Sequence, residues 1–359
     1  MKKFSQSLFV TFLILLVFSG FVSSTLCSCH RQVEKKKVGV VFPLTGDLAF
    51  VGEFMKNSLL LDSTDVTYII EDCQSKPSQA TMAANKLINQ DKVSYVVSTL
   101  SFLSEAINPV CESKNIPHFI LSFSPTLVDK SNVIQPFVST RLEAEKFVDY
   151  IRSNGYYKVA FLRHQEPDAT YGFEKIIEPK LKEMGVEIID VPFNNATIKD
   201  FKPEILKIKQ AEPELIVIQS LAYNIPNIVS AIKTYNITIP VLGDVNFLDI
   251  QDAQTMELVA GIPFVGIQSV LTSYYSQFKQ KYIEKYKIAP FALGSFSYDL
   301  GLYLRQIPAH ASMDEIMTLL NGMTDPCLVN NNEVRFNKSG QENVVCKILT
   351  FKDNDVVEY

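Results

Sequence analysis

Val38-Gly-Val-Val-Phe42 is a continuous apolar run that ends at Pro43. A short apolar run that ends at a strand-breaking residue is typical of a strand buried on both faces. Such strands occur in parallel sheets, because helices cover both faces of the sheet. The helical periodicity that follows over residues 53–61 agrees with this interpretation.

The alternation of strand and helix continues and then starts again. Further strands are predicted at 66–70, 93–97 and 118–121, with helices at 78–89 and from Phe102. From Ala144 the second series comprises helices at 144–151, 171–184, 201–210 and 225–235 and strands at 159–162, 187–191, 215–219 and 239–242. This alternation predicts an α/β fold of two doubly wound parallel-sheet lobes.

The last part of the chain departs from this pattern. Three helices are predicted at 274–286, 291–305 and 313–320, followed by a hairpin of 333–336 and 344–351 around a turn at 337–340. In doubly wound sheets, ligands bind at the carboxyl ends of the strands, and a cleft between two lobes suits a small molecule.

The N-terminus has the pattern of an export signal. Lys2 and Lys3 precede an apolar stretch from Leu8 to Val22, so residues 1–28 are predicted to be a signal peptide. An uncleaved transmembrane anchor is the alternative, because the stretch approaches the length of a membrane span. Leu26-Cys-Ser-Cys29 resembles the bacterial lipobox, which predicts lipidation at Cys29, although ordinary cleavage near residues 23–25 stays open.

Composition restricts the partners of the exported chain. The net charge of −5 argues against a nucleic-acid partner, which would favour a clustered basic surface. The scattered His and Cys residues show no metal-ligand spacing, so neither a metal nor a cofactor is predicted. In an oxidising compartment, Cys327 and Cys346, which flank the predicted hairpin, could form a disulfide.

Several motifs together resemble the branched-chain amino-acid receptor type of ABC-transporter substrate-binding protein, of the type 1 periplasmic-binding fold. The resemblance covers nearly all of the mature chain, and it rests on the order of the motifs more than on any single one. The motifs are Val38–Gly46, Gly52, Glu71–Pro77, Tyr171-Gly172, Phe201, Gly243, Ser297–Asp299 and Phe336–Gly340.

The resemblance implies a clamshell whose lobes are joined by three crossovers. Residues 37–141 and 270–328 would form one lobe, and residues 142–269 and 329–359 the other. It also implies a non-enzymatic protein at the outer side of a membrane, tethered by its lipid, that delivers a small, amino-acid-like solute to an ABC permease. A sensing or interaction lipoprotein of the same fold, with a receptor or a cell-envelope enzyme as partner, is the alternative.

The resemblance assigns ligand contacts to residues at strand ends. Ser101, at a helix start, would meet a ligand carboxylate, although it could instead only cap its helix. In the loop Ser122-Phe-Ser-Pro-Thr126, Thr126 would bind the carboxylate, and the carbonyl of Ser124 would accept from an ammonium.

Two further contacts would come from the second lobe. Tyr171 would cover the ligand, and Asp244 lies one position before the acidic partner of the ammonium, where Val245 stands. Val51 and Leu221 stand where the family often has aromatic residues, which leaves the ligand class open. No catalytic residues are predicted, because neither a nucleophile elbow nor a phosphate-binding loop is present.

Overall fold

The computed structural model describes residues 36–62, 64–195, 197–198, 200–324, 328–329 and 335–359. The predicted signal peptide, Cys29 and Cys327 lie outside these ranges. Within them, no helix is both long and apolar enough to cross a membrane.

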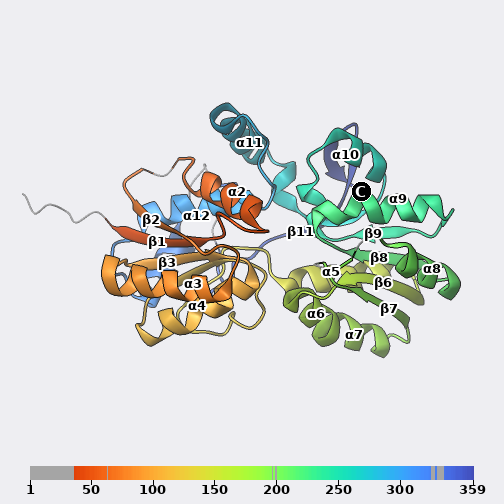
Figure 1. The fold of residues 1–359 in the computed structure, drawn as a ribbon, viewed down its shortest axis with the longest axis horizontal. Helices are drawn as coiled ribbons and strands as arrows, with labels where there is room; N and C mark the ends of the chain where they lie inside the picture. The colour runs from red at the N-terminus through yellow and green to blue at the C-terminus, as the bar shows by residue number, and fades with distance from the viewer. Residues whose placement is uncertain (1–35, 63, 196, 199, 325–327, 330–334) are drawn as a thin grey trace, which may run out of the picture. The chain divides into compact units, whose positions relative to one another are not determined.

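The first sheet consists of parallel strands in the order β2-β1-β3-β4-β5 (Figure 1). Its helices α2, α3 and α4 follow β1, β2 and β3, and α11, α12 and α13 join them from later in the chain. The bounds are β1 (Lys37–Phe42), α2 (Ala49–Leu59), β2 (Thr67–Asp72), α3 (Pro77–Lys86), β3 (Tyr95–Thr99), α4 (Ser101–Ser113), β4 (His118–Leu121), β5 (Val133–Ile134), α11 (Ser273–Tyr286), α12 (Gly294–Gln306) and α13 (Met313–Gly322).

The second sheet has the order β12-β11-β10-β9-β8-β6-β7. Its strands β6 to β10 are parallel, and β11 and β12 are antiparallel additions at one edge. The bounds are α5 (Thr140–Asn154), β6 (Lys158–His164), α6 (Pro167–Gly172), α7 (Glu178–Glu183), β7 (Glu187–Phe193), α8 (Lys202–Ala211), β8 (Leu215–Gln219), α9 (Ile225–Thr234), β9 (Val241–Gly243), α10 (Ala253–Val259), β10 (Phe264–Ile267), β11 (Cys346–Lys352) and β12 (Asp355–Glu358).

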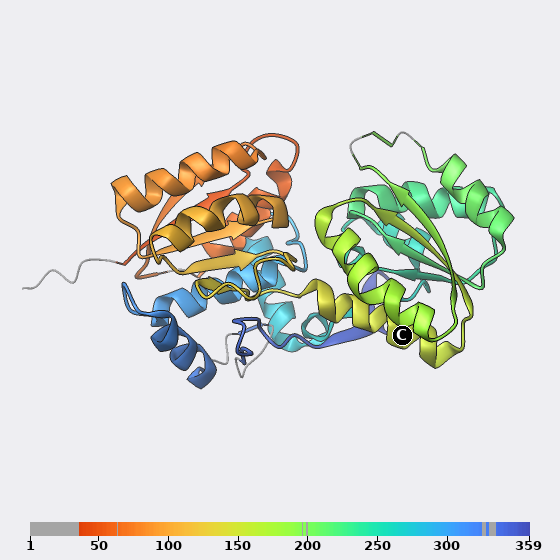
Figure 2. The same cartoon turned by 90° about the horizontal axis from the view of Figure 1, so that it is seen from below.

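Helices cover both faces of each sheet, which explains the uninterrupted apolar strands (Figure 2). In β1, Val40 packs in the cluster that contains α2, whereas Val41 packs in the cluster that contains α3 and α4. In β6, Leu162 faces α8 and α9, and Phe161 faces α5 and α7. The predicted α/β fold with doubly wound parallel sheets is confirmed.

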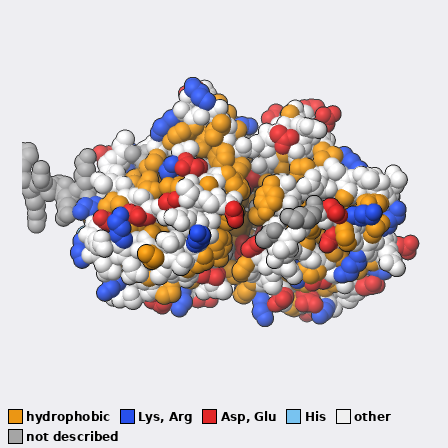
Figure 3. All heavy atoms as spheres, viewed as in Figure 1, with side chains coloured by type: hydrophobic (Ala, Val, Ile, Leu, Met, Phe, Trp, Pro, Cys, Tyr) orange, Lys and Arg blue, Asp and Glu red, His pale blue; other side chains and the backbone are white. Residues whose placement is uncertain are grey.

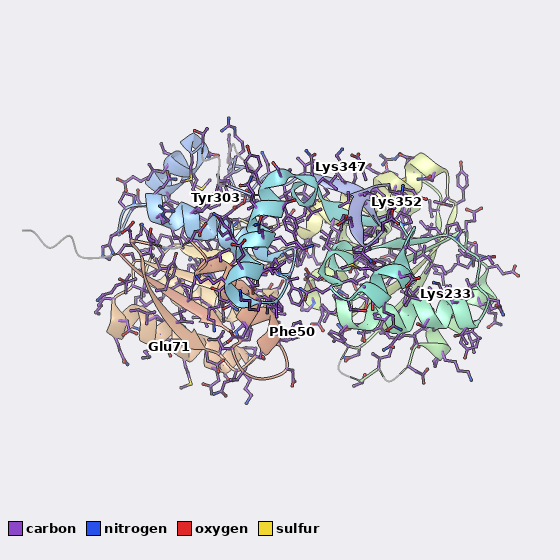
Figure 4. The ribbon with its side chains drawn as sticks, turned by 90° about the horizontal axis from the view of Figure 1, so that it is seen from above. Phe50, Glu71, Lys233, Tyr303, Lys347 and Lys352 are labelled. Carbon is purple, nitrogen blue, oxygen red and sulfur yellow. The ribbon has the colours of Figure 1, made fainter. Side chains whose placement is uncertain are left out.

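The segments that connect the two sheets are bonded to one another. Gln135, which follows β5, donates its N–H to the carbonyl of Gly340 at 2.8 Å, and Glu342 donates back to Gln135 at 3.1 Å. Tyr303 on α12 donates its hydroxyl to Glu342 at 3.1 Å. Figure 4 labels Tyr303 together with Lys347 and Lys352, which lie near the start and at the end of β11. These bonds tie the segment before β11 to the end of the first sheet.

The prediction of the terminal hairpin is wrong in its pairing. Strand β11 pairs with β12 through a turn at Asp353 and Asn354, both at positive φ, which Asp and Asn tolerate better than most residues. Among the described residues, the segment before it makes two isolated bridges, an antiparallel one between Phe336 and Glu342 and a parallel one between Gln341 and Gln135. The Asn337–Gly340 turn therefore joins Phe336 to Glu342 in a short antiparallel contact, whereas β11 pairs with β10 and β12 instead.

Gly52 permits a close approach of α2 to the end of β1. A Cβ atom at this position would lie 2.0 Å from the carbonyl oxygen of Pro43. We therefore expect Gly52→Ala to lower the free energy of unfolding by about 1–3 kcal/mol, because the helix must shift. Chemical denaturation measures this loss, with Gly322→Ala as control because no atom lies within 4 Å of its added Cβ. Equal stability of both variants would contradict the prediction.

Candidate functional site

Both sheets have a topological switch point, where strands on either side lead into helices on opposite faces. In the first sheet this point lies between β1 and β3, and in the second between β6 and β8. Ligands of doubly wound proteins bind outside the carboxyl ends of such strands. The segments at these ends are the loop 43–48, the start of α4, the start of α6 and Ser220.

Asp72, at the end of β2, holds the loop that follows β1. Its Oδ1 accepts N–H groups from Leu44 at 2.9 Å and Thr45 at 3.1 Å, and its Oδ2 accepts the Thr45 hydroxyl at 2.5 Å. Burial acts to raise the pKa of Asp72, but these bonds outweigh it and hold the pKa below its usual value. The loop at this switch point is therefore fixed by an ionised carboxylate.

Ser101 begins α4 directly after β3. Leu100 before it has φ 63° and ψ 133°, a conformation that costs a non-glycine residue on the order of 1–3 kcal/mol. The Ser101 side chain is buried, and α4 packs against α6, which begins beside Asp168. The Ser101 hydroxyl acts to lower the pKa of the Asp168 carboxyl. The predicted ligand residue of the first sheet thus meets an acidic side chain from the second.

Ser124 and Thr126 lie together after β4. Both hydroxyls donate to Oε1 of Glu105 on α4, each at 2.7 Å. Ser124 is fully buried, whereas Thr126 is exposed. The hydroxyls that the resemblance brings to a ligand are therefore bonded to a carboxylate of the chain itself.

Asp244 follows β9 and is buried. One oxygen accepts from the N–H of Ser220 at 2.9 Å and from the side chain of Asn246 at 2.8 Å. Its pKa lies well above the usual value, because of burial and the neighbouring charge of Glu143. Asp244 thus orders the loops after β8 and β9.

Glu143 and Asp168 complete an acidic group that the sequence analysis did not single out. Glu143, near the start of α5, accepts the N–H of Val245 at 2.9 Å. Burial, opposed by this bond and assisted by the charge of Asp168, raises the pKa of Glu143 to about 7. Burial and the charge of Glu105 raise the pKa of Asp168, although its hydrogen bonds act to lower it.

Tyr171 lies on α6, three residues after Asp168. It is half-buried and packs against the apolar cluster of α5, β6 and α7. Its contact with a ligand stays a prediction, as do those of Ser101, Ser124, Thr126 and Asp244.

The described residues offer little for metal or disulfide chemistry. No group of three His, Cys, Asp or Glu side chains among them could hold a metal ion. Cys346 has no disulfide partner within the described part, and because Cys327 lies outside it, their pairing stays a prediction.

The face drawn in Figure 3 carries both signs of charge and is hollowed between the two halves of the molecule. A separate hollow of about 520 Å³ among Leu61, Asp62 and Lys285 contacts none of the predicted ligand residues. We therefore place the candidate site at the switch points, where residues of both sheets meet.

Comparison with known proteins identifies relatives at the level of family and fold. The family model described as periplasmic binding protein matches residues 35–307. No protein of curated function matches the sequence significantly.

Three solved structures illustrate the shared fold. A leucine binding protein from Thermotoga maritima has 20% identity and a TM-score of 0.74, with 90% of this chain and 97% of that chain covered. A Streptococcus pneumoniae branched-chain amino acid transporter substrate binding protein, solved with isoleucine, has 18% identity, coverage of 91% and 100%, and a TM-score of 0.74. A solute binding protein from R. palustris, solved with benzoate, has 16% identity, coverage of 90% and 94%, and a TM-score of 0.76.

Proposed function

Because the chain belongs to the periplasmic binding protein family, we propose that it is an extracytoplasmic solute-binding protein of an ABC transporter. It captures a small polar solute between two lobes and delivers it to a membrane permease, without catalysing a reaction. The observation that carries the proposal is the packing of α4, which starts at Ser101 at the first switch point, against α6, which begins beside Asp168 at the second. Similar structures are named for binding solutes as different as isoleucine and benzoate.

The proposed lobes are discontinuous in sequence. Residues 37–141 with 270–328 form the first, and residues 142–269 with 329–359 form the second. The proposed ligand contacts are Ser101, Ser124 and Thr126 from the first lobe and Tyr171 and Asp244 from the second. Strand ends and helix starts supply most of these residues, so rigid elements hold them in place.

Capture works by differential contact. A ligand that binds groups of both lobes gains contacts only when the lobes approach, so it shifts the population towards the closed form. Each hydrogen bond to a charged ligand group contributes about 1.5–3 kcal/mol. A permease can then distinguish the closed, ligand-bound form from the open, empty form by its shape.

Small-angle scattering tests capture directly. We expect the radius of gyration to fall when the mature protein is titrated with a solute that also raises its melting temperature. The panel should contain amino acids, aromatic acids and amines, and mass spectrometry of the natively purified protein should identify any ligand that copurifies. If a solute binds stoichiometrically and the scattering curve is unchanged, closure is refuted.

We also propose that Cys29 carries the lipid anchor. Cys29→Ser should move the protein from the membrane fraction to the soluble fraction, because stable anchoring depends on the acyl chains. Cys27→Ser is the matched control and should leave the protein membrane-bound. The measurement is detergent phase partition with intact-mass analysis. If Cys27→Ser releases the protein from the membrane and Cys29→Ser does not, the lipid is attached to Cys27 instead.

A further inference from the structure

The hydroxyls that would hold a ligand carboxylate already have anionic partners. Ser124 and Thr126 both donate to Glu105, and Ser101 starts α4, which packs against the helix that begins beside Asp168. A ligand carboxylate would have to displace these groups and would then lie beside two like charges. The arrangement therefore disfavours an anionic ligand group at these hydroxyls.

Four carboxylates form a connected series across the two switch points. Helix α6, which begins beside Asp168, packs against both α4 and α5, which carry Glu105 and Glu143. Glu143 in turn accepts the N–H of Val245, the residue after Asp244. Burial and the neighbouring negative charges raise the pKa values of Asp168, Glu143 and Asp244 in the same order along the series. No ion pair among the described residues joins any of the four to a Lys or Arg. Arg163, at the end of strand β6 that leads into α6, is already paired with Asp190. The series therefore lacks a countercharge within the described chain.

Two buried polar atoms, at the end of β8 and directly after β4, also have no hydrogen-bond partner among the described residues. They are Oε1 of Gln219, whose residue is 4% exposed, and Oγ of Ser122, whose residue is 2% exposed. A buried polar group without a hydrogen bond costs about 1–3 kcal/mol. Both atoms can accept a hydrogen bond, so a ligand that donates would satisfy them.

The position of Gln219 follows from strand alternation. Leu215 and Val217 of β8 pack in the cluster that contains α5, and Gln219, two residues further, lies on the same face at the strand's carboxyl end. Glu143 is near the start of α5, at that end of the sheet. Gln219 therefore lies on the same face and at the same end of the sheet as Glu143.

Ser122 occupies the corresponding place beside α4. His118 of β4 bonds Asn108 of α4, and Ser122, four residues on, lies on the same face nearer the start of that helix. Glu105 and Ser101 lie in this first part of α4. The unpaired hydroxyl of Ser122 thus lies at the opposite end of the acidic series from Gln219.

We propose that the site binds an organic cation with two or more ammonium groups and no carboxylate, a di- or polyamine. Ammonium groups only donate, which suits the carboxylates, Gln219 and Ser122 together. Several positive charges suit a series of four carboxyl groups, because bound ammonium groups favour the ionised form of each. The proposal rests on the proposed capture function and specifies its ligand class.

Calorimetric titration of the mature protein at pH 8 and low salt tests this ligand class. We expect spermidine and putrescine to bind stoichiometrically, with spermidine the tighter and its binding weakened by salt, whereas L-leucine, benzoate and calcium chloride should not bind. Binding of leucine or benzoate without amine binding would overturn the proposal while leaving solute capture intact. Binding of calcium alone, or of none of these probes, would also overturn it.

A double variant locates the binding. Glu105→Gln with Asp168→Asn keeps the side-chain shapes and should weaken spermidine binding by about 100-fold. Glu112→Gln, exposed on the same helix α4, is the matched control and should bind as the wild type does. Circular dichroism checks the fold, and if the double variant does not fold, Glu105→Gln alone should weaken binding at least tenfold. Unchanged affinity in a folded variant would refute the site.

Discussion

At pH 8, the Glu143→Gln variant should unfold at a higher temperature than the wild-type protein, whereas near pH 5 the two should nearly coincide. The folded protein raises the pKa of Glu143 to about 7, against 4.5 for an ordinary glutamate, mainly through burial. The folded state therefore retains a proton that the unfolded state releases. Stability from this group is full below pH 4.5 and is lost as the pH rises through 7.

The size of the effect follows from the displaced pKa. A shift from 4.5 to about 7 corresponds to about 3 kcal/mol, and the partial solvent exposure of Glu143 reduces this to on the order of 1–3 kcal/mol. Glutamine avoids the loss because its amide is neutral and its oxygen can still accept from Val245. Melting curves between pH 4.5 and 8.5 measure the difference.

The groups that face Glu143 determine the sign of this difference. They are Asp168 from α6, Asp244 after β9 and Cys346 on β11, while Lys146 lies one turn further along α5. The acidic neighbours oppose ionisation, so they strengthen the effect. Glu183→Gln, an exposed residue of α7, is the control and should follow the wild-type curve. A lower melting temperature for Glu143→Gln at pH 8 would contradict the burial argument.

The fold could be predicted from the sequence because its central strands are apolar throughout. The predicted bounds of β4 and β8 are identical to those observed. The short and edge strands are harder to predict. Strand β5 has only two residues, β10 is short and contains Gly266, and β12 begins and ends with an acidic residue. Short and polar edge strands give a weak periodic signal, which explains the wrong hairpin.

The site could be predicted only in part. The resemblance selected Ser101, Ser124 and Thr126, but not Glu105, whose carboxylate bonds the last two. Glu143 and Asp168 occur in the first turns of helices, where acidic residues are common because they favour the helix dipole. A sequence pattern cannot distinguish such residues from exposed acidic residues on a helix. They are recognised as part of the site only because α4, α5 and α6 pack together.

Replacing Arg163 by alanine should lower the free energy of unfolding by about 2–4 kcal/mol. The Arg163 side chain is 7% exposed and makes two parallel bonds to Asp190, at 2.8 and 2.9 Å. Its guanidinium also lies 4.4 Å above the ring of Phe173. Removal breaks a buried pair, although Asp190 is 35% exposed, which keeps the loss below that of a fully buried ion. Arg163→Lys should recover only part of the loss, because an ammonium cannot form the paired bonds.

Arg152→Ala provides the matched control for this substitution. Arg152 bonds Asp149 at 3.1 Å with both side chains more than half exposed, so its loss should cost less than about 0.5 kcal/mol. Urea denaturation compares the two variants, and equal losses would show that burial of the pair adds nothing. Arg163 also contacts Thr170 of α6, the helix that begins beside Asp168. Arg163→Ala should therefore weaken spermidine binding as well, whereas Arg152→Ala should not, because only the buried pair supports the helix that presents this carboxylate.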